Sequence, residues 1–138
     1  MATCLIVDDS RVIRTVARRI FEELHFNTRE AEDGMSALRA AREKMPDLIM
    51  LDWSMPGMTG LEFVRGLRAL PEGGRPLILV CTTEADAGEI AHAVAAGIDD
   101  YIMKPFDRES LSAKLAELHA NRSGAVRANS LQSAAAGP

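Results

Sequence analysis

The stretch LIMLDWSMPGMTG, residues 48–60, places the acidic residue Asp52 between four apolar residues and a segment rich in turn formers. A continuous apolar run is typical of a central strand of a parallel sheet, because both faces of such a strand are covered. Pro56 and Gly57 favour turns, so the chain is expected to leave the sheet there. The stretch therefore predicts a buried strand that carries one ionisable side chain at its carboxyl end.

The same alternation of a short run followed by a longer amphipathic segment occurs five times up to about residue 120. The run at 27–31 is polar and has the character of an edge strand, whereas the others are mainly apolar. Strands that alternate with helices favour one parallel sheet with helices on both faces, an α/β fold. The expected strands are 3–7, 27–31, 48–51, 77–81 and 101–103, and the expected helical segments are 10–24, 34–44, 61–70, 85–97 and 107–120.

Length and composition predict one small globular domain rather than a multidomain chain. The 138 residues suit one domain, which we place at 1–120, followed by a small, polar and mobile tail at 121–138. A net charge of -4 argues against a general nucleic-acid binder. The amino-terminal run is too short for a signal peptide and no apolar run is long enough to cross a membrane, so we expect a cytosolic protein. Cys4 and Cys81 lack the CxxC spacing and are expected to be buried thiols.

Candidate polar residues directly follow the first, third, fourth and fifth of the expected strands. In parallel sheets of this kind, ligands bind at the carboxyl ends of the strands, near the point where strand order reverses. We therefore expect these side chains to converge at one edge of the sheet. They are Asp8, Asp9, Asp52, Thr82, Thr83 and Lys104.

Three carboxylates at one edge would repel one another, and a bound cation is the simpler solution. Oxygen ligands of high charge in a small site suit Mg²⁺. Lys104 precedes Pro105, which favours an extended backbone, so its ammonium can reach Asp52 or an added phosphoryl group. The alternatives are that Asp8 caps a helix while Asp9 is solvated, and that Lys104 is an ordinary surface lysine.

Four motifs in this order and spacing make the resemblance specific. They are VDDS at 7–10, LDWSMPGMTG at 51–60, CTTEA at 81–85 and YIMKP at 101–105. Residues 3–120 are similar to the receiver domain of two-component response regulators, of the CheY-like single-domain type. This resemblance implies a flavodoxin-like (βα)5 fold with strand order 2-1-3-4-5.

The resemblance also implies a role for each matched residue. Asp52 would accept a phosphoryl group from a phosphohistidine on a sensor kinase or histidine phosphotransfer protein, assisted by Lys104 and Thr82. Asp9, Asp52 and the backbone carbonyl of Ser54 would ligate Mg²⁺ directly, with Asp8 acting through water. Thr82 and Tyr101 would switch the surface of helix four, strand five and helix five, about residues 86–119, for a downstream target.

The implied protein catalyses only its own phosphorylation and dephosphorylation, in chemotaxis or another phosphorelay, as a monomer or weak dimer. No nucleic acid or membrane is expected as a direct partner. Thr83 is bulkier than the alanine or glycine common there, and we expect it to slow phosphate turnover.

Other readings of the same residues remain. A phosphohydrolase of the haloacid dehalogenase type needs a second acid two residues beyond its nucleophile, where this chain has Ser54. A flavodoxin or dinucleotide binder needs a phosphate-cradling loop after its first strand, where Asp8 and Asp9 would repel phosphate. A receiver-like module that is not phosphorylated, and the first domain of a longer regulator, stay open as alternatives.

Overall fold

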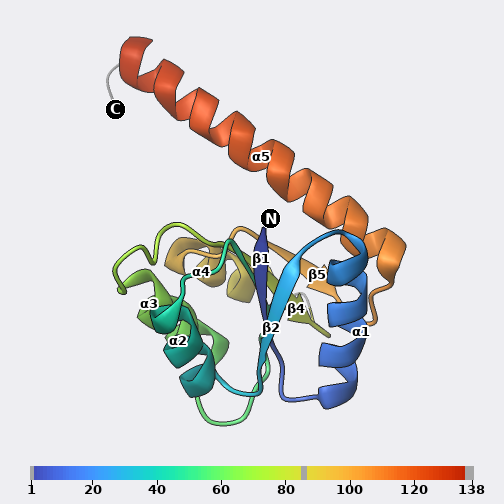
Figure 1. Ribbon diagram of the computed structural model, residues 1–138. Coiled ribbons are helices and arrows are strands. Elements are labelled where there is room, and N and C mark those ends of the chain that lie inside the picture. The colour runs from blue at the N-terminus through green and yellow to red at the C-terminus, as the bar shows by residue number, and fades with distance from the viewer. Residues whose placement is uncertain (1, 85–86, 136–138) are drawn as a thin grey trace. The chain divides into compact units, whose positions relative to one another are not determined.

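A computed structural model describes the backbone of residues 2–84 and 87–135, and the side chains of these residues as far as 121 (Figure 1). The chain divides into two compact units, Met1–Phe106 and Asp107–Pro138. The first unit holds the whole sheet and the first four helices, and the second begins just before the last helix.

The first unit contains a five-stranded sheet in which every neighbouring pair is parallel. The strand order is β2-β1-β3-β4-β5, which confirms the flavodoxin-like order that the resemblance implied. Strand order reverses between β1 and β3, so the segments that follow these two strands emerge side by side. The strands are β1 (Thr3–Val7), β2 (Asn27–Ala31), β3 (Leu48–Asp52), β4 (Leu77–Thr82) and β5 (Asp100–Met103).

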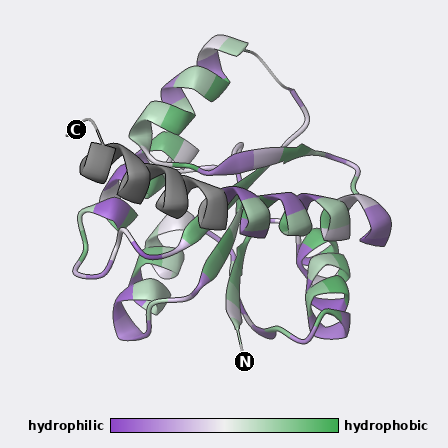
Figure 2. Cartoon of the chain, turned by 90° about the horizontal axis from the view of Figure 1, so that it is seen from above, coloured by the Kyte–Doolittle hydropathy of each residue, from purple (hydrophilic) through white to green (hydrophobic). Residues whose placement is uncertain are grey.

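Helices cover both faces of this sheet. Helix α1 (Arg11–Glu23) lies on one face, and α2 (Gly34–Glu43) and α3 (Gly60–Arg68) lie on the other (Figure 1). Helix α4 (Ala87–Ala96) contributes Ala93 to the same core cluster as α2 and α3. Figure 2 shows hydrophilic and hydrophobic residues alternating along the helices, as expected for amphipathic helices that each bury one side.

Alternate residues of the central strands point into this core, because side chains along a strand face opposite sides of the sheet. β3 is buried along its whole length, as its continuous apolar sequence predicts. β2 buries only its last residue, Ala31, which agrees with its predicted edge character. The largest fully buried side chains of the core between the sheet and helices α2 to α4 are Leu5, Ile49, Leu51, Ile78, Phe63 and Leu67.

Capping residues fix where the helices near the strand ends begin. The Ser10 hydroxyl accepts a hydrogen bond from the Ile13 N–H at 3.3 Å, so Ser10 is the N-cap of α1. Thr59 and Glu62 form a reciprocal capping box at the start of α3. The loop that follows β3 therefore ends at Thr59, the N-cap of α3.

The second unit contains helix α5 (Arg108–Ala135), which continues past residue 120. Residues 136–138 lie outside the described part of the chain, as do the side chains from 122 onward. The predicted boundary at 120 and the mobility of the segment 121–138 stay predictions. Among the helices of the described residues, none is both long and apolar enough to cross a membrane.

Gly73 lies in the turn between α3 and β4, where even one added methyl group has no room. A Cβ there would overlap the Leu67 carbonyl oxygen and lie 2.7 Å from the Leu70 carbonyl oxygen. Both are backbone atoms that cannot rotate away, so we expect Gly73→Ala to lower the free energy of unfolding by roughly 1–3 kcal/mol. Urea denaturation measures this difference.

Gly74 provides the matched control, because a Cβ at that position meets nothing within 4 Å. We expect Gly74→Ala to leave the free energy of unfolding unchanged or to raise it by about 0.4–1 kcal/mol through the unfolded state. Equal stabilities of the two variants would contradict this account of the turn.

Candidate functional site

Three carboxylates meet at the carboxyl edge of the sheet. Asp8 directly follows β1 and Asp52 is the last residue of β3, and these strands are neighbours. Oxygen atoms of Asp8, Asp9 and Asp52 all lie within 4.8 Å of one another. Asp8 and Asp52 are only 3% and 5% exposed, whereas Asp9 is exposed to solvent. The structure thus brings together the acidic residues that the sequence placed at the ends of two strands.

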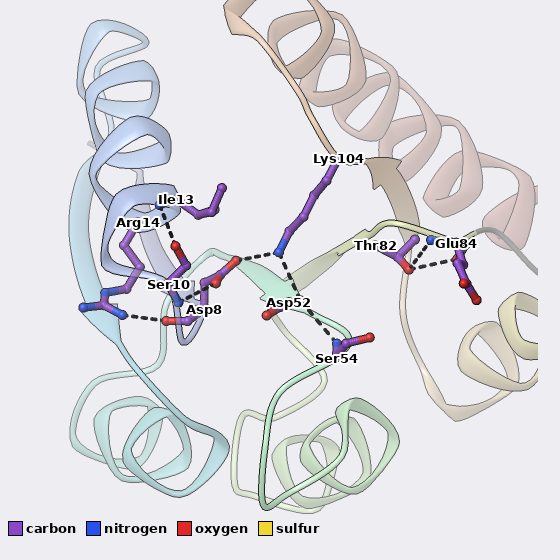
Figure 3. Close-up of polar contacts among 9 residues, drawn as sticks. All are labelled: Asp8, Ser10, Ile13, Arg14, Asp52, Ser54, Thr82, Glu84 and Lys104. Carbon is purple, nitrogen blue, oxygen red and sulfur yellow. Dashed lines mark hydrogen bonds and ion pairs between the residues drawn. The ribbon is translucent and has the colours of Figure 1, made fainter.

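Lys104 reaches this acidic cluster from the end of β5. Its Nζ lies 3.0 Å from Asp8 Oδ2 and 3.2 Å from Asp52 Oδ1, so one ammonium pairs with both buried carboxylates (Figure 3). Its backbone N–H donates to the Thr82 carbonyl at 2.8 Å, which ties the start of the turn after β5 to β4. The side chain of Lys104 is 17% exposed. It is therefore part of the site and not an ordinary surface lysine.

The surroundings of Asp52 make its ionised form costly. Burial raises the pKa of its carboxyl, and the charge of Asp8 raises it further. Lys104 and the Ser54 N–H, which donates to Asp52 Oδ1 at 3.2 Å, oppose that rise without cancelling it. Burial lowers the pKa of Lys104, but the neighbouring carboxylates of Asp8 and Asp52 outweigh it and the net pKa is raised. Lys104 pairs with two carboxylates, and a third, that of Asp9, lies close by, so the site retains an excess of negative charge.

This raised pKa gives Asp52→Asn a predicted effect on stability. An acid whose pKa is higher in the folded state destabilises the fold as pH rises from the ordinary aspartate range through its raised pKa. With a chelator present, Asp52→Asn should therefore increase the free energy of unfolding at neutral pH, and by less in acid. Urea denaturation over a pH series measures the difference from wild type.

Asp47 provides a control of opposite sign, because its hydrogen bond from the Thr3 N–H at 2.8 Å lowers its pKa. Such a carboxylate stabilises the fold above its unfolded pKa, and the benefit is lost as pH falls through its folded pKa. Asp47→Asn should lower the free energy of unfolding at neutral pH, with the loss disappearing in acid. If both variants showed the same sign, the electrostatic account of Asp52 would be wrong.

Thr82 and Tyr101 lie beside the site but do not join its ion pairs. The Thr82 hydroxyl donates to the Glu84 carbonyl at 2.8 Å and accepts from the Glu84 N–H at 3.2 Å (Figure 3). Thr82, Tyr101 and Trp53 line one narrow, mostly apolar pocket together with residues of α4. The predicted switch pair therefore shares a pocket, with its threonine turned to the loop before α4.

One residue at this edge was missed by the sequence analysis. Arg14, on α1, donates from Nη1 to the Asp8 carbonyl at 2.7 Å (Figure 3). It also pairs with Glu30 on β2. Its position one turn into the helix after the acidic pair is the only signal, and it becomes informative once β1, β2 and α1 are packed together.

The fold and this cluster define a receiver domain. Residues 4–116 match the family described as "Response regulator receiver domain", and the chain belongs to that family. The residues of the acidic cluster and the lysine after β5 belong to the motifs that carried the resemblance, and they lie close together in the structure. The strand order is the one that the resemblance implied.

Chemotaxis proteins are among the known proteins that resemble it along most of its length. It is 38% identical over 112 residues to chemotaxis protein CheY-3 of Vibrio cholerae, covering 80% of this chain and 86% of the relative. The structure of chemotaxis protein CheY4 of the same organism superposes with a TM-score of 0.82 and 34% identity, covering 86% of this chain and 98% of that one.

A third similar protein is the receiver domain of a sensor histidine kinase from Pseudomonas aeruginosa, solved with a magnesium ion coordinated in its active site cleft. It has a TM-score of 0.76 and 31% identity, and the match covers 85% of this chain and 96% of that domain. The chain is thus a CheY-like receiver of two-component signalling, which supports a phosphoryl-accepting signalling role.

Proposed function

We propose that this receiver accepts a phosphoryl group on Asp52 from a phosphohistidine of a sensor kinase or histidine phosphotransfer protein, in a Mg²⁺-dependent reaction. The observation that carries the proposal is the position of Asp52. Its carboxylate ends a fully buried strand, contacts Lys104 and lies beside two further carboxylates. A carboxylate that is held rigidly and faces a cation is suited to act as a nucleophile toward phosphorus.

The donor set fits a hard divalent cation. Oxygen atoms of three carboxylates within 4.8 Å of one another carry more charge than Lys104 balances. We assign Asp9, Asp52 and the Ser54 carbonyl as direct ligands of Mg²⁺ and Asp8 as a ligand through water. When bound, the ion would neutralise charge that develops on the transferred phosphoryl oxygens.

The chain's own groups then supply the remaining chemistry. An Asp52 oxygen forms the new bond to phosphorus while the bond from phosphorus to the histidine nitrogen of the donor breaks. The donor ring carries a proton on its other nitrogen, so it leaves with the electron pair of the broken bond as a neutral imidazole, and the product on Asp52 is an acyl phosphate. Lys104 stays protonated, as its raised pKa favours, and transfers its contact from the carboxylate to a phosphoryl oxygen. No group of the receiver has to act as a general base in this step.

The output follows from the pocket that Thr82 and Tyr101 share. On phosphorylation, the Thr82 hydroxyl leaves Glu84 and donates to the phosphoryl group, and Tyr101 occupies the space that opens. Residues of about 86–119, from helix four through helix five, then present a changed surface to a downstream protein target. The target binds the phosphorylated and the unphosphorylated forms with different affinities. This difference in affinity couples phosphorylation to signalling in the cytosol, in chemotaxis or another phosphorelay.

The sole tryptophan makes the proposal testable, because Trp53 is adjacent to Asp52 in the chain. We would titrate the protein with Mg²⁺ and then with beryllofluoride while recording Trp53 fluorescence, with Asp52→Asn as the control. We expect a change with each reagent in wild type, and no response to beryllofluoride in the variant. The absence of any response, with no phosphoryl adduct by intact mass, would favour a receiver-like module that phosphorylation does not regulate.

A further inference from the structure

Arg14 joins three elements at the acidic edge of the sheet. Its side chain extends from α1 and is 14% exposed. Nη1 donates to the backbone carbonyl of Asp8, and Nε lies 3.1 Å from Glu30 Oε1 on β2. Arg18, one turn further along α1, lies 3.5 Å from the other oxygen of Glu30. Glu30 therefore orients Arg14, and Arg14 contacts the loop that carries Asp8 and Asp9.

Contacts from four directions hold Asp8 in place. Its N–H donates to the Ala31 carbonyl at 3.1 Å. Its carboxylate accepts from the Ser10 N–H at 2.8 Å and from Lys104 at 3.0 Å. The Asp8 carbonyl is the remaining polar group, and the guanidinium of Arg14 binds it at 2.7 Å. A hydrogen bond from a charged donor is stronger and shorter than one between neutral groups.

The position of the Asp9 side chain depends on this hydrogen bond from Arg14 more than that of Asp8 does. Its carboxylate is exposed, and no hydrogen bond or ion pair engages it among the residues that the structure describes. The carbonyl of Asp8 and the N–H and Cα of Asp9 belong to one planar peptide unit. A contact that fixes the Asp8 carbonyl therefore fixes where the Asp9 side chain starts.

We propose that Arg14, oriented by Glu30, is a positioning residue that holds the peptide unit between Asp8 and Asp9 and so pre-organises Asp9 for Mg²⁺. The inference rests on the proposed function, because that proposal assigns Mg²⁺ to this cluster. Residues that orient metal ligands from outside the ligand set typically change metal affinity by about 10–100-fold when they are replaced. The effect is carried by geometry, since Arg14 contacts the backbone and not a carboxylate of the cluster.

The test measures the Kd for Mg²⁺ by Trp53 fluorescence in wild type, Arg14→Gln, Arg14→Lys and Arg18→Gln. We expect Arg14→Gln to raise the Kd by about 10-fold or more. Arg14→Lys retains the charge but loses the fork that contacts Asp8 and Glu30 together, so its Kd should also rise. Arg18→Gln removes a charge near Glu30 without touching the Asp8 loop, so its Kd should stay near the wild-type value.

Two variants of Glu30 separate positioning from charge. Glu30→Gln keeps an oxygen that accepts from Arg14 Nε and should retain most of the Mg²⁺ affinity, whereas Glu30→Ala should lose it. Urea denaturation in chelator confirms that each variant is folded under the conditions of the titration. Long-range charge acts in the opposite direction, because removing a positive charge near a cation site lowers the Kd. A decrease in Kd that is equal for Arg14→Gln and Arg18→Gln, and that salt removes, would therefore assign the effect of Arg14 to long-range charge and overturn the proposal.

The outcomes also separate this inference from the proposed function. If wild type binds Mg²⁺ and Arg14→Gln binds it equally well, the positioning role of Arg14 is wrong and the proposed function stands. If wild type itself binds no Mg²⁺, both are overturned.

Discussion

Asp52→Asn is expected to abolish phosphoryl uptake from a small acyl-phosphate donor in the presence of Mg²⁺. The amide has nearly the same shape and its Oδ1 can still accept from the Ser54 N–H. In the proposed reaction the carboxylate charge attacks phosphorus and ligates the metal, and the amide lacks that charge, so the chemistry should fail while the fold persists. Intact-mass spectrometry measures the result, with the mass of one phosphoryl group added to wild type and none to the variant.

Asp33→Asn is the matched control for this loss. Asp33 caps α2, where it accepts from the Ser36 N–H at 2.8 Å, and asparagine is an equally good N-cap. This variant should be phosphorylated like wild type. Uptake by Asp52→Asn at the wild-type level would mean that another residue is the acceptor.

The second large effect is expected at Lys104. Lys104→Met keeps the length of the side chain but removes the ammonium between Asp8 and Asp52. We expect phosphorylation by the small donor to slow by on the order of 100-fold, because a charged donor aimed at the transferred group is lost. In chelator, the variant should also unfold at lower urea concentrations, since two buried carboxylates are left facing each other without a cation.

Two further variants resolve the two roles of Lys104. The double variant Asp8→Asn with Lys104→Met removes one of the two carboxylate charges that repel each other. It should recover the free energy of unfolding lost in Lys104→Met but not the rate of phosphorylation. Lys44→Met, at an exposed position at the end of α2, should change neither. An unchanged phosphorylation rate in Lys104→Met would exclude contact between this lysine and the phosphoryl group.

Local sequence predicted most elements of the first unit because the burial along each element follows the pattern of apolar residues in its sequence. The run at 48–51 is apolar throughout and is buried throughout. Cys4 and Cys81 lie within strands, and burial raises the pKa of both thiols, as expected for buried thiols. The strand order came from the family resemblance and not from periodicity, because local patterns carry no information on which strands become neighbours.

The site could be predicted only as a set of strand-end residues. Their convergence follows from parallel strands, whose carboxyl ends meet at one edge. The pairing of Lys104 with two carboxylates at once, and the hydrogen bonds between Thr82 and Glu84, depend on side-chain directions that sequence spacing does not contain. Arg14 was missed for the same reason, because its partners lie on a neighbouring strand and a loop backbone.

The most direct test of the central account is to identify which residue carries the phosphoryl group. The protein would be treated with an acyl-phosphate donor and Mg²⁺ and then reduced with borohydride, which converts an aspartyl phosphate into homoserine but leaves phosphate esters of serine and threonine unchanged. Peptide sequencing by mass spectrometry is expected to find homoserine at position 52 alone. Phosphate that survives on Ser54 or Thr82, or homoserine at position 8 or 9, would contradict the account.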